Sequence, residues 1–141
     1  MVIILTIRLP EKETVLLVGG HDGNQCLSSL IILQTNEKNF KKLTIQLPYP
    51  IHRHGAQFLK NHLYIFGGQN ECKESLDTTY QLSQSLKWKE MTKMNEKRRG
   101  ISNSCVVLSD KIWVLGGWNG KKWLKSVEIF DPVTNTWKFM R

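Results

Sequence analysis

Residues 112–117 read Ile-Trp-Val-Leu-Gly-Gly, and this short pattern decides the fold. Residues 15–20 and 63–68 repeat it, each as an apolar run that ends in two glycines. The pairs Gly19-Gly20, Gly67-Gly68 and Gly116-Gly117 are almost evenly spaced, and a large aromatic follows each at the same distance: Phe40, Trp88 and Trp137. Repeat folds have periods of roughly 20–50 residues. The sequence therefore predicts one supersecondary unit used three times, with these glycines and aromatics in structural roles.

The third unit contains four β-rich runs separated by turn residues, at 104–108, 112–115, 126–130 and 137–140. The run 112–115 is apolar on both faces, which is typical of a strand that is covered on both sides. The glycine pair after it permits positive φ angles and a close approach of neighbouring backbones. Four antiparallel strands joined by tight turns would form a small sheet with two apolar faces. Such a sheet must stack on copies of itself.

The second unit follows the same plan, with runs at 55–59, 63–66, 78–82 and 88–91. The first unit is less regular and offers only 15–18, 30–33 and a run that begins at Phe40. We expect no first strand for this unit, because the stretch from Arg8 to Thr14 contains Pro10 and four charged residues. In a closed ring, that strand would come from the far end of the chain.

The chain divides into an N-terminal segment and three repeats. The segment covers 1–12, and the repeats cover 13–49, which is incomplete, 50–97 and 98–141. The apolar opening 1–7 is interpreted as a strand or a wrongly assigned start. A signal peptide is not expected, because Arg8 interrupts the run and neither a basic leader nor a small-residue cleavage site is present.

The chain has 141 residues and a formal net charge of +8. Its densest basic run is 93–99, and two interpretations stay open: a solvated surface, or attraction to an acidic partner such as an acidic peptide or actin. No recognition motif supports nucleic acid as a partner, and the apolar runs are too short to span a membrane. Cys26, Cys72 and Cys105 stand at different places in the three units. They indicate reduced thiols in an intracellular protein rather than a repeated disulfide or metal cage.

The glycine pairs, the aromatics Tyr64 and Trp113 shortly before two of them, and the tryptophans farther on resemble the kelch repeat. Residues 126–137, Ser-Val-Glu-Ile-Phe-Asp-Pro-Val-Thr-Asn-Thr-Trp, are especially similar to the pattern of that family. The resemblance covers roughly residues 13–141. Kelch repeats form β-propellers in which each repeat is one four-stranded blade. The resemblance implies an all-β fold, a partial kelch-type β-propeller of about three four-stranded antiparallel blades.

The chain looks most like the propellers of BTB-BACK-kelch, or kelch-like, proteins. Those propellers recruit substrates to cullin-based ubiquitin ligases, and several bind actin. The resemblance therefore implies a protein-binding module in the cytoplasm or on the cytoskeleton, either a ligase substrate adaptor or an actin-binding or scaffolding protein. Contact with a cullin would need a BTB domain, which this sequence does not contain.

Three blades are fewer than the six that kelch-like propellers usually have. We therefore expect the faces of the end blades to be uncovered, including aromatics such as Trp137. An uncovered sheet face favours association. The chain is accordingly interpreted as a fragment, a truncated product, or half of a ring that is closed by self-association.

Partner binding in this family resides on loops at one rim, and two sets of loops are expected to reach it. The candidate residues are His21, Asp22, Gln69, Asn70, Trp118 and Asn119 after the glycine pairs, and Arg53 and Arg99 before the first strands. Arg53 stands where arginines grip acidic ligands in the family, and its planar guanidinium suits a carboxylate. The alternative for Arg53 is an exposed side chain that binds nothing. For Trp118 the alternative is packing beneath its loop.

Residues for catalysis or for a cofactor do not form a recognisable pattern. His52 and His54 would put two imidazoles on one strand face, which suits a metal, but no third ligand is in view. Galactose oxidase also carries a kelch propeller, yet Cys72 and Tyr80 fit no copper pattern with these histidines. No acid pair, nucleophile–base pair or phosphate loop stands out. We expect no enzyme, no cofactor and no metal, with a copper oxidase as a remote alternative.

Overall fold

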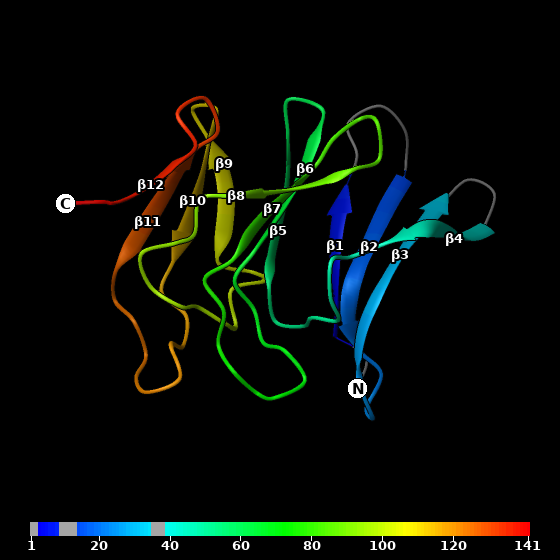
Figure 1. The fold of residues 1–141 in the computed structure, drawn as a ribbon, viewed down its shortest axis with the longest axis horizontal. Helices are drawn as coiled ribbons and strands as arrows, with labels where there is room; N and C mark the ends of the chain where they lie inside the picture. Colours follow the sequence, from blue (N-terminus) through cyan, green and yellow to red (C-terminus); the bar gives the residue numbers. More distant parts are fainter. Residues whose placement is uncertain (1–2, 9–13, 35–38) are drawn as a thin grey trace.

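The computed structural model describes residues 3–8, 14–34 and 39–141, which form three four-stranded antiparallel sheets (Figure 1). The first sheet contains β1 (Ile3–Arg8), β2 (Thr14–His21), β3 (Cys26–Gln34) and β4 (Asn39–Gln46). The second contains β5 (Gly55–Leu59), β6 (His62–Phe66), β7 (Thr79–Leu82) and β8 (Trp88–Met91). The third contains β9 (Cys105–Leu108), β10 (Lys111–Leu115), β11 (Val127–Asp131) and β12 (Thr136–Phe139).

Strands that follow one another in the sequence are neighbours within each sheet, as in the blades of a propeller. The prediction of a partial β-propeller with three four-stranded blades is confirmed. The three sheets lie side by side in chain order (Figure 1). Among the described residues, no helix has the length and apolar character to cross a membrane.

The first sheet has its own first strand, β1, and the expectation that this strand is missing or comes from the far end of the chain is wrong. β1 pairs antiparallel with β2, with Leu5 opposite Val18 and Ile7 opposite Leu16. The strand occupies the opening run of the chain, which is rich in the β-branched residues that strands favour. It ends at Arg8, the first of the four charged residues that argue against a strand, and before Pro10.

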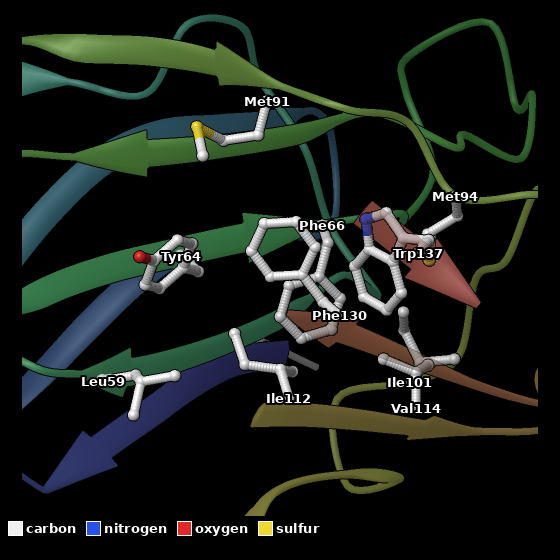
Figure 2. Close-up of a cluster of buried hydrophobic side chains, with 10 residues drawn as sticks. All are labelled: Leu59, Tyr64, Phe66, Met91, Met94, Ile101, Ile112, Val114, Phe130 and Trp137. Carbon is white, nitrogen blue, oxygen red and sulfur yellow. The ribbon is translucent and has the colours of Figure 1, made fainter. Parts of the chain in front are cut away.

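Strand β6 shows why the second sheet needs an uninterrupted apolar run. Alternate side chains of a strand point to opposite faces. Leu63 and Ile65 belong to a core shared with the first sheet, whereas Tyr64 and Phe66 belong to a core shared with the third. The first core contains Leu16, Val18, Leu30, Leu47, Ile51, Ala56, Leu63, Ile65 and Leu82. The second, shown in Figure 2, contains Leu59, Tyr64, Phe66, Met91, Met94, Ile101, Ile112, Val114, Phe130 and Trp137.

The repeated aromatics occupy three different environments. Trp137 on β12 is only 6% exposed and packs against the second sheet, so the expectation that it lies on an uncovered face is wrong. Trp88 on β8 packs against the first core and donates its Nε1–H to the carbonyl of Gln46 at 2.7 Å. Phe40 on β4 is 69% exposed, which contradicts a structural role in the core. Each tryptophan faces the preceding sheet, and within the described residues no sheet precedes the one that carries Phe40.

The uncovered face of the third sheet lies on the side opposite to the second sheet. It carries Leu108 and Leu115, which are exposed, and Trp113, which is half-buried. Ile112 and Val114 point the other way and are buried in the second core. Strand β10 is therefore covered on one face only by the part of the chain that the structure describes. Self-association through the open face stays a proposal.

A buried ion pair fixes the connection between the second and third sheets. Arg98 and Glu128 are both fully buried, and Arg98 Nη2 lies 3.1 Å from Glu128 Oε1. Arg98 also donates to the carbonyls of Gly116 and Ser126, at 2.7 and 3.0 Å. Glu128 Oε2 accepts from the backbone and side-chain nitrogens of Asn95, both at 2.8 Å. The solvated-surface interpretation of the basic run is therefore wrong for Arg98.

Candidate functional site

The loops at one edge of the three sheets lie next to one another, at the bottom of Figure 1. They are the segments 21–26, 67–78 and 116–126 after the glycine pairs, and the connections 47–54 and 92–104 between sheets. Backbone hydrogen bonds join the two sets. His52 and Gln69 exchange a pair, at 3.2 and 2.8 Å, and Arg99 and Trp118 exchange another, at 3.0 and 2.9 Å. We call this surface the rim.

Asp22, Asn70 and Asn119 each stand two residues after a glycine pair, and each closes its own loop. The carboxylate of Asp22 accepts from the backbone N–H of Gln25 at 2.9 Å, and this hydrogen bond is the main reason that the pKa of Asp22 is lowered. Asn119 accepts in the same way from Lys121 at 2.9 Å. Asn70 accepts from a backbone N–H of its loop at 3.0 Å. These hydrogen bonds give all three side chains a role in loop geometry.

A hollow of about 430 Å³ lies on the rim between the loops of the first and second sheets. Its lining residues are His21, Asn24, Cys26, His52, Arg53, Gln69, Asn70, Glu71 and Lys73. Four of the candidate residues are thus brought together, whereas Asp22, Arg99, Trp118 and Asn119 lie outside the hollow. Arg53 and Lys73 give the lining two cationic side chains against one carboxylate, that of Glu71. The lining of the hollow therefore carries more positive than negative side chains.

Arg53 adopts a left-handed backbone conformation, with φ 54°, which is uncommon for residues other than glycine. Its carbonyl accepts the N–H of Gly100 at 2.8 Å. Gly100 has the equivalent place in the next unit. Arg53 follows His52, whose backbone pairs with Gln69, and Gly100 follows Arg99, whose backbone pairs with Trp118. Gly100 has a φ of 71°. The side chain of Arg53 is exposed and forms no ion pair within the described residues.

Arg99 links the hollow to the loop of the third sheet. Its Nη1 donates to the carbonyl of Lys73, which lines the hollow, at 2.9 Å, and its backbone pairs with Trp118. Trp118 is half-buried and packs edge-to-face against Trp123, with the ring centroids 5.3 Å apart. Sequence reasoning missed Lys73 and Trp123 as rim residues. The tryptophan among lysines at 121–125 is the signal that could have identified Trp123.

His52 and His54 do not form the paired site that their spacing suggests. The left-handed Arg53 between them breaks the alternation of an extended strand. His52 borders the hollow, where its Nδ1 lies 3.1 Å from Cys26 Sγ. His54 is fully buried, and within the part of the chain that the structure describes neither of its ring nitrogens has a hydrogen-bond partner. Among the described residues, no group of three His, Cys, Asp or Glu side chains is placed to hold a metal ion.

The Cys26–His52 pair stays uncharged at neutral pH. Burial, followed by the charge of Glu71, raises the pKa of the Cys26 thiol. Burial, followed by the charge of His21, lowers the pKa of the His52 imidazole. A nucleophilic cysteine needs the opposite shifts, because the thiolate is the reactive species. These shifts therefore disfavour a thiolate nucleophile at Cys26.

Comparison with known proteins gives one matching family and several relatives. Residues 6–141 match the model of the KLHDC2/KLHL20/DRC7 kelch-repeats domain. Spermatocyte protein spe-26 of Caenorhabditis elegans is 27% identical over 132 residues, which cover 89% of this chain and 23% of that protein. Kelch-like protein 23 of Pongo abelii is 27% identical, with 91% of this chain and 22% of the relative covered. Kelch-like protein 36 of Mus musculus is 27% identical, with 94% of this chain and 22% of the relative covered. The chain thus spans less than a quarter of the length of these curated relatives.

Proposed function

Because the chain belongs to the kelch-repeat family, we propose that it binds an acidic segment of a partner protein in the hollow of its rim, with Arg53 as the main contact. The kelch-like relatives support a propeller that interacts with proteins. Binding residues concentrate on loops that a rigid scaffold positions. Here the stacked sheets supply the scaffold, and backbone hydrogen bonds hold the rim loops against each other. The role is recognition, with no bond made or broken.

The strained backbone of Arg53 is the observation that carries the proposal. A residue with a side chain is roughly 1–2 kcal/mol less stable than glycine in the left-handed conformation. The next unit avoids this strain by using Gly100 at the equivalent place. Arg53 accepts the strain although its exposed side chain forms no ion pair within the described fold. Positive φ also occurs at turn residues such as Lys60 and Ser109, so Arg53 stands out because it lines the hollow where the equivalent residue of the next unit is glycine. Strained residues cluster at functional sites, and a ligand would explain an arginine at this place.

A carboxylate is the ligand group that best fits the part of the hollow lined by Arg53. A guanidinium holds a carboxylate through two parallel charged hydrogen bonds. Lys73 adds a second positive charge to the lining, and Arg99 holds the Lys73 backbone in place through its carbonyl. The net charge of +8 also favours the approach of an acidic partner.

Substitution of Arg53 by glycine tests the proposal because it separates binding from folding. The probe is a fluorescein-labelled peptide of glutamates, and its affinity is measured by fluorescence anisotropy. We expect Arg53→Gly to weaken binding about tenfold, because charged hydrogen bonds are lost. We expect the melting temperature to stay the same or to rise, because the relief of left-handed strain offsets the greater freedom of glycine in the unfolded chain.

The matched control is Lys89→Ala, which removes the same charge from the exposed face of β8, outside the rim. We expect this variant to bind the glutamate peptide like the parent protein. Binding of the parent should also weaken as salt screens the charges. An equal loss of affinity in both variants would mean that only net charge matters, and Arg53 would then have no specific role.

A more specific proposal is that the rim recruits substrates to a cullin ubiquitin ligase. The likeness to kelch-like proteins supports it. A cullin contact would need a BTB domain, so this proposal predicts one upstream in the transcript that encodes the chain. Transcript sequencing tests it, and a transcript with only further kelch repeats on both flanks would contradict it.

The alternative is an actin-binding or scaffolding role in the cytoplasm, which the positive charge favours. Co-sedimentation with filamentous actin at rising salt tests this alternative. Binding through a basic surface would weaken as the salt concentration rises. Absence of co-sedimentation at low salt would exclude it.

A further inference from the structure

We infer that the hairpin Trp118–Lys125 is a second contact site on the rim, which receives an apolar side chain flanked by carboxylates. This inference rests on the proposed function, since it assigns a further feature to the same acidic partner. It specifies the chemistry of the partner. Negatively charged residues would bind in the hollow at Arg53, and an apolar residue within the same acidic segment would contact Trp123.

The hairpin holds Trp123 in a fixed position. Its two tryptophans pair through a backbone bridge, and Asn119 N–H donates to the carbonyl of Lys122 at 3.2 Å. Leu124 is buried, and its N–H donates to the carbonyl of Gly117 at 2.8 Å. Because the loop is already ordered, a partner that contacts Trp123 loses little conformational entropy.

Trp123 has the exposure expected of a contact residue rather than a core residue. Its side chain is 73% exposed, and one edge rests against the half-buried Trp118. Among the described rim loops, Trp123 is the only large hydrophobic side chain that is exposed. Tryptophan is enriched among the few residues that dominate binding energy at protein interfaces, because it offers a large apolar area with few rotatable bonds.

The charges around Trp123 decide what kind of segment it receives. Residues 118–125 contain Lys121, Lys122 and Lys125, all exposed, and no acidic residue. A partner whose apolar residue reaches Trp123 therefore places its neighbours beside lysines, which favours carboxylates at those positions. A lipid surface is less well matched, because interfacial membrane binding uses a broad apolar face rather than a single indole.

The hairpin is structurally continuous with the hollow. Trp118 pairs with the backbone of Arg99, whose guanidinium donates to the carbonyl of Lys73 in the lining of the hollow. The Ser75 hydroxyl, from the same loop as Lys73, donates to the carbonyl of Trp118 at 3.2 Å. One extended segment lying across these joined loops would reach both sites.

Two fluorescein-labelled peptides test the inference. One has four glutamates on each side of a central leucine, and the other has serine in place of the leucine. We expect the parent protein to prefer the leucine peptide about tenfold in fluorescence anisotropy, as is typical when a contact residue at an interface is removed. Trp123→Ala should abolish this preference without changing the affinity for the serine peptide, and Trp123→Phe should restore part of it.

Leu86→Ala is the matched control, because Leu86 is 60% exposed but lies in the turn between β7 and β8, away from the rim. This variant should keep the preference for leucine. A preference that survives Trp123→Ala would overturn the inference. So would binding of phosphatidylserine vesicles that depends on Trp123 when neither peptide binds.

The same titrations distinguish failure of the inference from failure of the proposed function. If Arg53→Gly leaves both peptide affinities unchanged while Trp123→Ala removes the leucine preference, the role of Arg53 fails and the hairpin site stands. If Arg53→Gly weakens both peptides while the leucine preference is absent from the parent, the hairpin inference alone fails. Lack of binding of both peptides and of vesicles would overturn both.

Discussion

Trp137 donates its indole Nε1–H to the hydroxyl of Thr79 at 3.0 Å, and this hydrogen bond crosses from the third sheet to the second. The indole also packs against Phe66 on the second sheet and Phe130 on the third, with centroid distances of 5.7 and 5.0 Å. Figure 2 shows the three rings side by side in the second core. Trp137 thus joins two sheets through both its apolar rings and its one polar atom.

Replacement of Trp137 by alanine is expected to destabilise the protein by about 3–5 kcal/mol, because a buried aromatic side chain leaves a large cavity. Trp88→Ala is the matched comparison. Trp88 is only half-buried, so its loss is expected to cost about 1–3 kcal/mol. Urea denaturation of both variants gives the two free energies. Equal losses would contradict the greater structural role of Trp137.

Gly67→Ala is expected to destabilise the protein more than Gly100→Ala. Both glycines have positive φ, at 59° and 71°, so each substitution adds about 1–2 kcal/mol of backbone strain. A Cβ on Gly67 would also lie 2.5 Å from the carbonyl oxygen of Arg98, whereas one on Gly100 would meet nothing within 4 Å. This clash adds roughly 1–3 kcal/mol.

The difference between these two alanine variants, measured by urea denaturation, reports the close approach at Gly67 alone. Similar losses would mean that the positive φ, and not the neighbouring backbone, is the reason for glycine at position 67. Gly23→Ala offers a further check, because Gly23 has a φ of 108° and open space around its Cα.

The fold could be predicted from the sequence because the signals are local and repeat. The strand ranges of the second and third units follow from short apolar runs between turn residues, and β6 lies close to the predicted run at 63–66. The burial of individual aromatics could not be predicted in this way. Phe40 and Trp137 hold the same place in their repeats, but within the described residues a preceding sheet packs against Trp137 and none packs against Phe40. Whether a sheet lies beside the aromatic depends on how the sheets assemble.

The candidate site was only partly predictable for the same reason. The position of the glycine pairs locates the rim loops, so His21 and Arg53 could be selected from the sequence. Which residues share a hollow depends on pairing between loops far apart in the chain, such as that between His52 and Gln69. The burial of Arg98 within a basic run likewise depends on Glu128, thirty residues away.

Glu128→Gln is expected to cost about 3–5 kcal/mol of stability, because the Arg98 guanidinium loses its only fully buried counter-charge among the described residues and keeps only the partly exposed Glu96. Glu96→Gln is the control. Glu96 also lies 3.1 Å from Arg98 Nη2, but its side chain is partly exposed, so a loss of about 1 kcal/mol or less is expected. Urea denaturation at neutral pH compares the two. A larger loss for Glu96→Gln would show that Glu128 is not the main partner of Arg98.

Acidification is expected to destabilise the protein through His54. Burial, with a smaller contribution from the charge of His52, lowers the pKa of His54 from 6.5 to about 4. Between these values the unfolded chain binds a proton that the folded protein does not, so stability falls as the pH drops from about 6.5 towards 4. Linkage sets the slope at roughly 1.4 kcal/mol per pH unit across this window. Urea denaturation at several pH values measures it.

His54→Leu isolates this effect, and we expect the variant to be more stable than the parent protein. At neutral pH the variant should be more stable by about 1–3 kcal/mol, because both ring nitrogens of His54 are buried and have no hydrogen-bond partner among the described residues. Leucine also removes the titrating group, so the fall in stability between pH 6.5 and 4 should become shallower by the slope assigned to His54. His62 is half-buried at the start of β6, and His62→Leu should leave the pH dependence of stability unchanged. If His54→Leu keeps the full pH dependence, the acid sensitivity arises elsewhere in the chain.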